Sequence, residues 1–421
     1  MLIVFLIFAA VLMWFSFKSL MGGFRYLEFF RTKLAKPLPD WKPFATVICP
    51  CRGIDEGMEG NLAAILAQDY PNHEVIFVVD DEADPAAEMI RGIFNRRDAE
   101  TQRKEHTTTV FASASQRLCG EKLVVAPKAT ISAQKVENLR EAVLHAHERS
   151  EVFVFVDSDT RVSPHWLRYL VGAVEPVNVG AATGYRWFIS GTPTFASEMC
   201  SVWNASIASA LGPNSRSNFC WGGSTAIRRD VFAMVDMREQ WRGTLSDDFA
   251  VTHAVRTAGL DVVHVPQALT GTVENCTFGE LLEFTTRQMK ITRVCMPQLW
   301  MMSLIGSAIF CGVMLAAFLI VILTRENTFP VWSAVVTLVF VSGCSIGKSW
   351  IRLKAVRLAL PQYASELKRQ FIPQNSLWLL SPGLFLYNTL AALFSRRIVW
   401  RGTTYELKSP TETVIIRSTD E

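Results

Sequence analysis

The chain has 421 residues, which is enough for one large soluble domain and further elements. Half of the residues are hydrophobic and the formal net charge is only +3, so charge gives no support for nucleic-acid binding. The nine cysteines are scattered. Cys49 and Cys51 form one C-x-C pair, and no second pair stands at the spacing of a zinc site.

The apolar residues are concentrated in runs that carry no charged side chain: positions 1–17, 294–324, 327–347 and 370–395. A membrane helix needs about 20 such residues. We therefore expect an N-terminal anchor in 1–24 and two transmembrane helices in 299–347. A cleaved signal peptide is the less favoured interpretation of the first run, because no basic residue precedes its apolar part.

Basic residues follow the first run, and they indicate the orientation of the chain: Lys18, Arg25, Arg31, Lys33 and Lys36. By the positive-inside rule this flank is cytoplasmic, so segment 25–298 is predicted to be a cytosolic domain. Segment 348–421 is predicted to begin as a basic cytosolic stretch and to end in a tail, and it contains the run 370–395, which has basic residues on both sides. The Ser-Pro-Gly at 381–383 favours a re-entrant segment there, with a third C-terminal span as the alternative.

Predicted strands alternate with helices from about residue 42 to about residue 177. The strands are expected at 45–49, 74–79, 123–126 and 153–156. This alternation favours an α/β fold with a doubly wound, parallel sheet. No glycine-rich nucleotide-binding motif follows any of these strands, which disfavours a dinucleotide-dependent dehydrogenase and a P-loop ATPase.

Acidic residues stand at the ends of two predicted strands. Asp80 and Asp81 follow the second, and Asp157 and Asp159 follow the fourth. Ligands of open α/β sheets bind beyond the carboxyl ends of the strands. Two carboxylates on one face suit Mg²⁺ or Mn²⁺ held against a substrate phosphate. The alternative is that the Asp-Ser-Asp segment is a turn that caps the next helix.

The later part of the domain contains a glycine-rich aromatic segment and an acidic pair. Segment 218–224 suits close approach of a backbone or a ligand, although Trp221 within it equally suits core packing. Asp247 and Asp248 stand in the first turn of a predicted helix that ends at Gly259. They serve either chemistry or only the helix dipole.

A basic amphipathic helix is predicted over 278–298, directly before the second apolar run. It carries Arg287, Lys290 and Arg293 among apolar residues. Such a helix typically lies at the membrane interface.

The order of these motifs resembles the inverting glycosyltransferases of family two, which have the GT-A (nucleotide-diphospho-sugar transferase) fold. The resemblance is closest to the ceramide glucosyltransferase branch, including bacterial hopanoid-type enzymes. Segment 79–86 looks like its D1 motif, 156–159 like D2 and 245–249 like D3, while Lys135 matches a lysine ahead of D2. The resemblance covers about 40–300 and implies a GT-A domain with transmembrane helices at both ends.

The fourth motif of the family, (Q/R)-x-x-R-W, is altered in this chain. Segment 287–291 has lysine in place of the arginine and isoleucine in place of the tryptophan. In processive polysaccharide synthases that tryptophan stacks on the acceptor sugar, so its absence argues against a polymer-extruding enzyme. The cation that stabilises the leaving diphosphate is left open among Arg287, Lys290 and Arg293, with Lys135 as a further candidate.

The resemblance implies one displacement at the anomeric carbon of a nucleotide sugar, UDP-glucose or UDP-N-acetylglucosamine. Asp248, next to Asp247, would be the general base, and Asp157 and Asp159 would hold Mg²⁺ or Mn²⁺. The implied substrate-binding residues are Asp80, Asp81 and Lys135 on the donor side and Trp221, Gly222 and Gly223 on the acceptor side.

The acceptor is expected to be a lipid hydroxyl, such as that of ceramide or a hopanoid. An active site between an anchor and an interfacial helix would lie at the depth of lipid headgroups, in a multi-pass membrane protein with a cytoplasmic catalytic domain. A polyprenyl-phosphate sugar transferase and a non-catalytic membrane scaffold are the alternatives. A metal-dependent phosphohydrolase is disfavoured because the seven histidines show no grouping.

Overall fold

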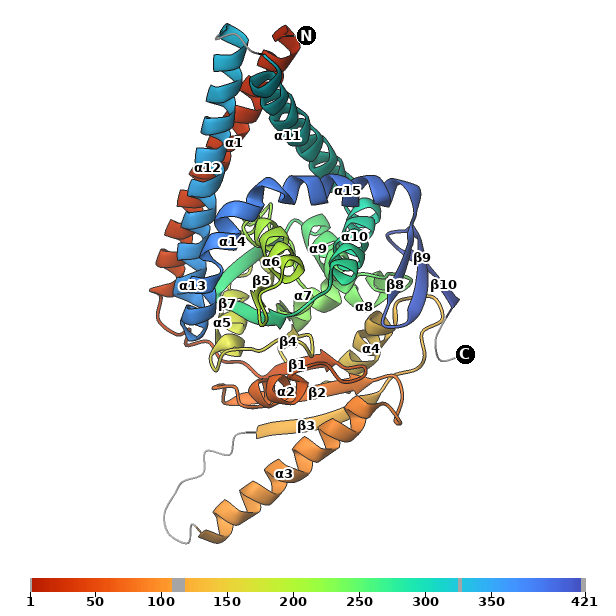
Figure 1. Cartoon of the computed structure of the whole chain (residues 1–421). Helices are drawn as coiled ribbons and strands as arrows, with labels where there is room; N and C mark the ends of the chain where they lie inside the picture. Colours follow the sequence, from red (N-terminus) through yellow and green to blue (C-terminus); the bar gives the residue numbers. More distant parts are fainter. Residues whose placement is uncertain (1, 108–117, 325–327, 418–421) are drawn as a thin grey trace. The chain divides into compact units, whose positions relative to one another are not determined.

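The computed structural model describes residues 2–107, 118–324 and 328–417. The chain forms two compact units that are interleaved along the sequence (Figure 1). The sheet unit comprises Lys36–Arg186, Pro213–Thr272 and Trp400–Glu421, and the helical unit comprises Met1–Ala35, Trp187–Gly212 and Val273–Val399. Each unit is described by itself below.

A seven-stranded sheet, in the order β3-β2-β1-β4-β6-β5-β7, forms the centre of the sheet unit. Its strands are β1 (Ala45–Pro50), β2 (Asn72–Val79), β3 (Leu118–Val125), β4 (Val152–Phe155), β5 (Val179–Ser190), β6 (Thr225–Arg228) and β7 (Asp261–Glu274). Strands β1 to β4 are parallel, whereas β6 is antiparallel to both β4 and β5. The predicted α/β fold is confirmed, and antiparallel strands extend the sheet where the predicted alternation weakens.

Strand β4 shows why the sequence forms a central strand here. All four of its residues are buried, so an unbroken apolar run replaces the alternation of a half-exposed strand. Val154 lies opposite Val47 of β1 on one side and opposite Ala226 of β6 on the other. The acidic segment after β4 therefore starts from the middle of the sheet.

Among the residues that the structure describes, seven α-helices accompany this sheet: α2 (Met58–Leu66), α3 (Pro85–Thr107), α4 (Gln134–Ala142), α5 (Trp166–Ala173), α7 (Arg229–Met234), α8 (Met237–Gln240) and α9 (Asp247–Thr257). Asp84 caps the start of α3, because the amide of Ala86 donates to Asp84 Oδ1 at 2.7 Å and Pro85 is the first helical residue. Ser246 caps α9 by accepting from the amide of Phe249 at 3.4 Å. Both helices thus begin at an acidic motif.

A second sheet of three strands, β10-β9-β8, lies at the C-terminus. It consists of β8 (Arg397–Trp400), β9 (Thr403–Ser409) and β10 (Glu412–Arg417). The turn between β8 and β9 places Arg401 and Gly402 in left-handed conformations, with φ of 51° and 80°. From Trp400 onward these strands belong to the sheet unit, although the sequence indicated only a tail here.

In the described part of the helical unit, three helices are long and apolar enough to cross a membrane: α1 (Leu2–Leu34), α11 (Pro297–Leu323) and α12 (Phe329–Ala359). Helices α1 and α12 run side by side, with Phe5, Ala9 and Leu12 in one apolar cluster with Ala334 and Val341 (Figure 1). All three candidate spans were predicted. Helix α12 continues beyond the predicted end of its span and carries the basic residues that follow it.

The fourth apolar run is bent. Segments Phe371–Leu379 and Ser381–Phe394 meet at 57°, and only together are they long and apolar enough to cross a membrane. The bend lies at the predicted Ser-Pro-Gly interruption, which is a common cause of helix kinks. Whether this run spans or re-enters the membrane stays a prediction.

The remaining elements of the helical unit are α6 (Phe195–Ala208), α10 (Phe278–Cys295), α13 (Ala364–Arg369), α14 (Phe371–Ser376) and α15 (Ser381–Phe394). Helix α10 starts with a capping box formed by Thr277 and Glu280. Trp203 of α6 stacks on Phe385 of α15 and meets Phe284 of α10 edge-on. Helix α10 is therefore packed by its apolar face in this unit.

Candidate active site

Lys135 joins the two acidic motifs of the sheet unit. Its ammonium, at the start of α4, lies 2.7 Å from Asp157 Oδ1 and 3.1 Å from Asp247 Oδ1. Burial by itself would lower the pKa of Lys135, but the two carboxylates outweigh it and raise that pKa. Burial raises the pKa of Asp247 to about 6 against the opposing charge of Lys135. The structure thus brings together three predicted site residues from three different elements.

Gly222 is the residue that allows this contact. A Cβ on Gly222 would lie 2.3 Å from Asp247 Oδ2 and 2.7 Å from the Lys135 ammonium. A Cβ on Gly223 would come within 2.2 Å of the Trp221 ring. The close approach predicted for this glycine segment is therefore made by side chains of the protein itself, and a substrate contact there stays a prediction.

Asp159 faces a cation of its own. Its Oδ2 lies 3.7 Å from Arg186, and 38% of its side chain is exposed. Burial and the neighbouring Asp157 raise the pKa of Asp159. The Arg186 guanidinium lies over the Trp221 ring at 5.4 Å from its centroid. Trp221 is only 7% exposed, so it packs in the core and also supports the cation next to Asp159.

The donor set suits a divalent cation that is shared with a substrate. Among the residues that the structure describes, no group of three histidine, cysteine or acidic side chains is placed to hold a metal alone. Mg²⁺ is commonly bound by one or two carboxylates together with substrate phosphates. Because Asp157 is engaged by Lys135 through one oxygen, Asp159 and the second oxygen of Asp157 are the fitting ligands.

Asp248 is held at one of its oxygens. The Ser246 hydroxyl and the amide of Phe249, the latter at 2.8 Å, both donate to Oδ1. Within the described residues, Oδ2 has no hydrogen-bond partner, and the side chain is half-buried. A carboxylate with one fixed and one open oxygen has the form expected of a general base. The start of α9 thus provides both Asp247, which is paired, and Asp248, which is open.

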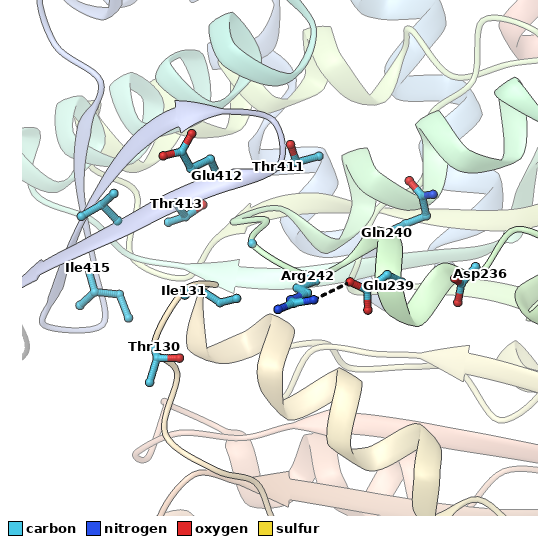
Figure 2. A pocket seen from close by; sticks show the side chains of 12 residues that line it. Thr130, Ile131, Asp236, Glu239, Gln240, Arg242, Thr411, Glu412, Thr413 and Ile415 are labelled. Carbon is cyan, nitrogen blue, oxygen red and sulfur yellow. Dashed lines mark hydrogen bonds and ion pairs between the residues drawn. The ribbon is translucent and has the colours of Figure 1, made fainter.

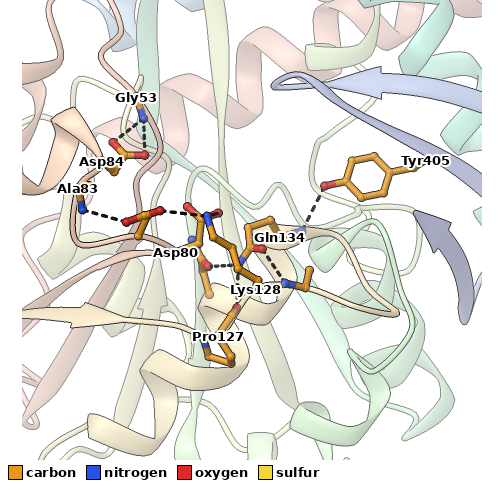
Figure 3. A network of polar contacts seen from close by, with 11 residues as sticks. Gly53, Asp80, Ala83, Asp84, Pro127, Lys128, Gln134 and Tyr405 are labelled. Carbon is orange, nitrogen blue, oxygen red and sulfur yellow. Dashed lines mark hydrogen bonds and ion pairs between the residues drawn. The ribbon is translucent and has the colours of Figure 1, made fainter. Parts of the chain in front are cut away.

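Lys128 pairs with both acids that follow β2 (Figure 3). Its ammonium lies 3.1 Å from Asp80 Oδ2 and 3.6 Å from Asp81 Oδ2. The amide of Ala83 donates to Asp81, and this bond and Lys128 lower the pKa of Asp81. Asp80 is buried, whereas Asp81 is exposed and accessible to a ligand. Lys128 was not among the predicted site residues. Its position just after the predicted third strand, where ligands bind, could have indicated it.

Two further contacts fix the loops around these acids (Figure 3). The amide of Gly53 donates to both oxygens of Asp84, at 2.9 and 3.1 Å, which ties the turn after β1 to the start of α3. Gln134 accepts from the amide of Ala129 at 2.7 Å and donates to the carbonyl of Pro127 at 3.0 Å. The loop that carries Lys128 is therefore closed by the residue next to Lys135.

Arg401, from the turn between β8 and β9, is a second residue that the sequence analysis missed as a site residue. It forms a two-point ion pair with Asp55, at 2.8 and 2.5 Å, and donates to the carbonyl of Arg52 at 3.3 Å. The contact joins residues that lie 346 positions apart, and no local sequence signal marks it.

The three predicted cations of α10 are engaged within the helical unit. Lys290 donates to the carbonyl of Arg397 at 2.7 Å, and Arg287 donates to that of Val399 at 3.4 Å. Arg293 donates to the carbonyl of Ala392 at 2.5 Å. All three therefore bond to backbone oxygens of the segment that ends α15 and enters β8. Their role toward a diphosphate stays a prediction.

Figure 2 shows a hollow in the sheet unit that the acidic motifs do not line. It measures about 590 Å³ and is lined by residues 130–131, by α8, by Arg242 and Gly243, and by residues 411–415. Arg242 pairs with Glu239, three residues earlier, on one wall of the hollow at 3.1 Å. None of the predicted site residues lines it, so its volume does not mark the site of chemistry.

Two solved structures are similar to the chain. The mannosyltransferase PcManGT from Pyrobaculum calidifontis, in complex with GDP-Man and Mn2+, is 16% identical, with 93% of this chain and 99% of that chain covered and a TM-score of 0.45. A mycobacterial protein is 15% identical, with 59% and 73% covered and a TM-score of 0.35.

The model of one protein family, glycosyl transferase family 21, matches residues 5–103 and 114–413. The match includes all the predicted site residues and Arg401. It confirms the prediction of a glycosyltransferase, and with the mixed sheet described above it agrees with the predicted GT-A fold. The matching family is family 21, whereas the resemblance in the sequence was to family two. The assignment to the ceramide glucosyltransferase branch stays a prediction. The chain belongs to glycosyl transferase family 21.

Proposed function

We propose that the protein transfers a sugar from a nucleotide sugar to a lipid hydroxyl, with inversion at the anomeric carbon. The observation that carries this proposal is the bridge from Lys135 to Asp157 and Asp247. It connects the segment of Asp159, which suits a metal, with the segment of Asp248, which suits a base. Both functions of an inverting transferase are thus supported at one place in the sheet unit.

On the donor side, Asp159 and Asp157 would hold Mg²⁺ or Mn²⁺, which when bound supplies positive charge to the diphosphate of the nucleotide sugar. Lys135 keeps Asp157 in place and adds a protonated ammonium. Asp81 is exposed and ionised beside Lys128, which suits hydrogen bonds to a ribose or a base. UDP-glucose and UDP-N-acetylglucosamine are the proposed donors, on the resemblance alone.

On the acceptor side, Asp248 would take the proton of the attacking hydroxyl. The hydroxyl oxygen bonds to the anomeric carbon, the bond to the diphosphate oxygen breaks, and the proton passes to the open Oδ2 of Asp248. The two donors at Oδ1 keep the carboxylate from rotating away. Asp247, held by Lys135, is a positioning residue for its neighbour.

The lipid acceptor is supported by the helical unit, which carries three helices with the length and hydropathy of membrane spans. A ceramide or hopanoid hydroxyl is the proposed acceptor, and a polyprenyl phosphate is the second candidate. We further propose that the protein is a multi-pass membrane protein with its catalytic unit on the cytoplasmic side, on the basis of the basic residues that follow its first apolar run.

The experiment is transfer from labelled UDP-glucose, UDP-N-acetylglucosamine and GDP-mannose to a total lipid extract by the full chain in detergent, with Mg²⁺, with Mn²⁺ and with chelator. We expect a labelled lipid with one UDP-sugar that disappears with chelator. Asp248→Asn should lower transfer by about 100- to 10,000-fold, as loss of a general base does.

Asp40→Asn, the same change at a fully exposed carboxylate, is the matched control and should retain full activity. Transfer that Asp248→Asn leaves unchanged would remove the base assignment. A wild-type chain that neither transfers nor hydrolyses any nucleotide sugar would favour the non-catalytic scaffold.

A further inference from the structure

The end of the chain, from Trp400 to Arg417, is a fixed part of the sheet unit, and we name it the C-terminal hairpin. Tyr405 is 2% exposed, and its hydroxyl accepts from the amide of Gln134 at 3.4 Å. Gly243 packs so tightly on the hairpin that a Cβ there would lie 2.2 Å from the carbonyl oxygen of Thr411. The hairpin is therefore anchored beside the residue that precedes Lys135.

Arg401 lies in the turn between β8 and β9, at the start of this hairpin, in an unfavourable backbone conformation. Its φ of 51° is in the left-handed region, which residues with a Cβ rarely adopt. The following Gly402 has a φ of 80° and carries no such penalty. Strain of this kind persists only where the surroundings hold it, and it concentrates at functional sites. The strained backbone therefore suggests that the side chain of Arg401 has a function.

Those contacts place Arg401 at the edge of the proposed metal site. The backbone carbonyl of its partner Asp55 accepts from the amide of Met58, at the start of α2, at 3.1 Å. In the first turn of α2, Asn61 donates to the carbonyl of Ser158 at 3.2 Å. Ser158 is the residue between Asp157 and Asp159. A short chain of bonded residues thus leads from Arg401 to the Asp-Ser-Asp segment.

The formal charges of the site favour an additional cation for a bound diphosphate. Five carboxylates and three cations make up the cluster, a formal balance of −2: Asp55, Asp157, Asp159, Asp247 and Asp248 with Lys135, Arg186 and Arg401. A divalent cation would neutralise that balance, and the diphosphate of a donor would then add negative charge again. Hydrogen bonds that Arg401 donates to Asp55, together with the charges of Asp55, Asp159 and Asp157, raise the pKa of Arg401, so it stays charged.

We propose that Arg401 binds the diphosphate of the nucleotide sugar and that Asp55 positions it for this contact. This inference rests on the proposed function. Arg401 would take the role of the arginine that the altered motif of α10 replaces with lysine. Its bonds to Asp55 and Arg52 use three of its five N–H groups, and the other two have no partner among the described residues. The side chain is 42% exposed, and a guanidinium fork matches phosphate oxygens in two-point contacts.

The test is calorimetric binding of UDP, with and without Mn²⁺, to the full chain in detergent, together with donor KM and kcat. Arg401→Gln should weaken UDP binding and raise donor KM by about 10- to 100-fold, the effect of one or two lost charge-assisted hydrogen bonds. Arg401→Lys should recover part of the loss, because it restores the charge but not the fork. Asp55→Asn should shift UDP affinity in the same direction by a smaller factor.

Arg417→Gln is the matched control, because it makes the same change at an exposed position of the same hairpin. It should leave UDP binding unchanged. Arg401→Gln with wild-type UDP affinity and a lowered melting temperature would show that the ion pair only fastens the hairpin, and would overturn the proposal. Failure of the proposed function looks different, since the wild-type chain itself would then bind no nucleoside diphosphate and transfer no sugar.

Discussion

The protein holds two sets of cations that differ in what they face. In the sheet unit, Lys135, Arg186 and Arg401 are paired with carboxylates. In the helical unit, Arg287 and Lys290 of α10 donate to backbone carbonyls of the segment that follows α15. The first set is joined to residues from distant parts of the chain, and the second joins one helix to one strand.

The difference teaches where binding of an anion is to be expected. A cation between carboxylates fixes the protonation and position of groups that can act on a substrate. A cation on carbonyl oxygens satisfies backbone acceptors and fixes the path of the chain. We therefore expect substitutions in the first set to change chemistry and those in the second to change stability, and three predictions test this division.

The largest effect is expected from Lys135→Met. This change leaves the buried Asp247 and the half-buried Asp157 without their shared cation, and breaking such a pair typically costs about 3 kcal/mol or more of unfolding free energy. Turnover should fall by about 1,000-fold, as when one preorganised electrostatic group is lost. Initial rates and thermal unfolding of the same preparation measure both quantities.

Lys122→Met is the control for that variant, because Lys122 pairs with a buried carboxylate of Glu74 at 2.8 Å but lies outside the acidic motifs. It should lose stability and retain turnover at temperatures where it is folded. If Lys135→Met retains more than a tenth of wild-type turnover, the bridge does not organise the site.

A smaller loss is expected from Gly222→Ala. The added methyl would meet Asp247 Oδ2 at 2.3 Å, so the carboxylate and Lys135 must move apart. Overpacking of this kind costs about 1–3 kcal/mol in stability. Turnover should fall by about 100-fold, because displacement of a catalytic neighbour by about 1 Å has that effect.

Gly92→Ala in α3 makes the same change where the nearest atom is 3.8 Å away, and it should be neutral in turnover. Equal turnover of the Gly222 and Gly92 variants would show that Asp247 can shift without consequence. The acidic pair would then serve only the start of α9.

The acids of the site were predictable because each follows a strand end or starts a helix. Asp157 and Asp159 come directly after β4, and parallel strands bring their carboxyl ends to one edge of a sheet. Lys135 was predictable only through the resemblance, since an amphipathic helix alone gives no reason to single out one lysine. The pairing of Lys135 with Asp247 depends on Gly222, because a side chain there would collide with both groups. A glycine in the sequence does not indicate which residues approach it.

Arg401 and the α10 cations mark the limit of local patterns. The hairpin that carries Arg401 reads as a polar tail, because its contacts are made with a turn 346 residues earlier. The cations of α10 read as candidates for a diphosphate, because a sequence shows the charge of a side chain and not the carbonyl that it meets. In both cases tertiary contacts decide the role.

The smallest effect is expected from Lys290→Met, the same substitution as at Lys135 but in the second set. It removes the bond to the carbonyl of Arg397, which is worth about 1 kcal/mol, and burial already lowers the pKa of this lysine. The melting temperature should fall slightly, while donor KM and kcat stay within about twofold of wild type. A rise in donor KM as large as that of Arg401→Gln would place Lys290 at the diphosphate, as the sequence motif predicts. The division between the two sets of cations would then fail at its most direct comparison.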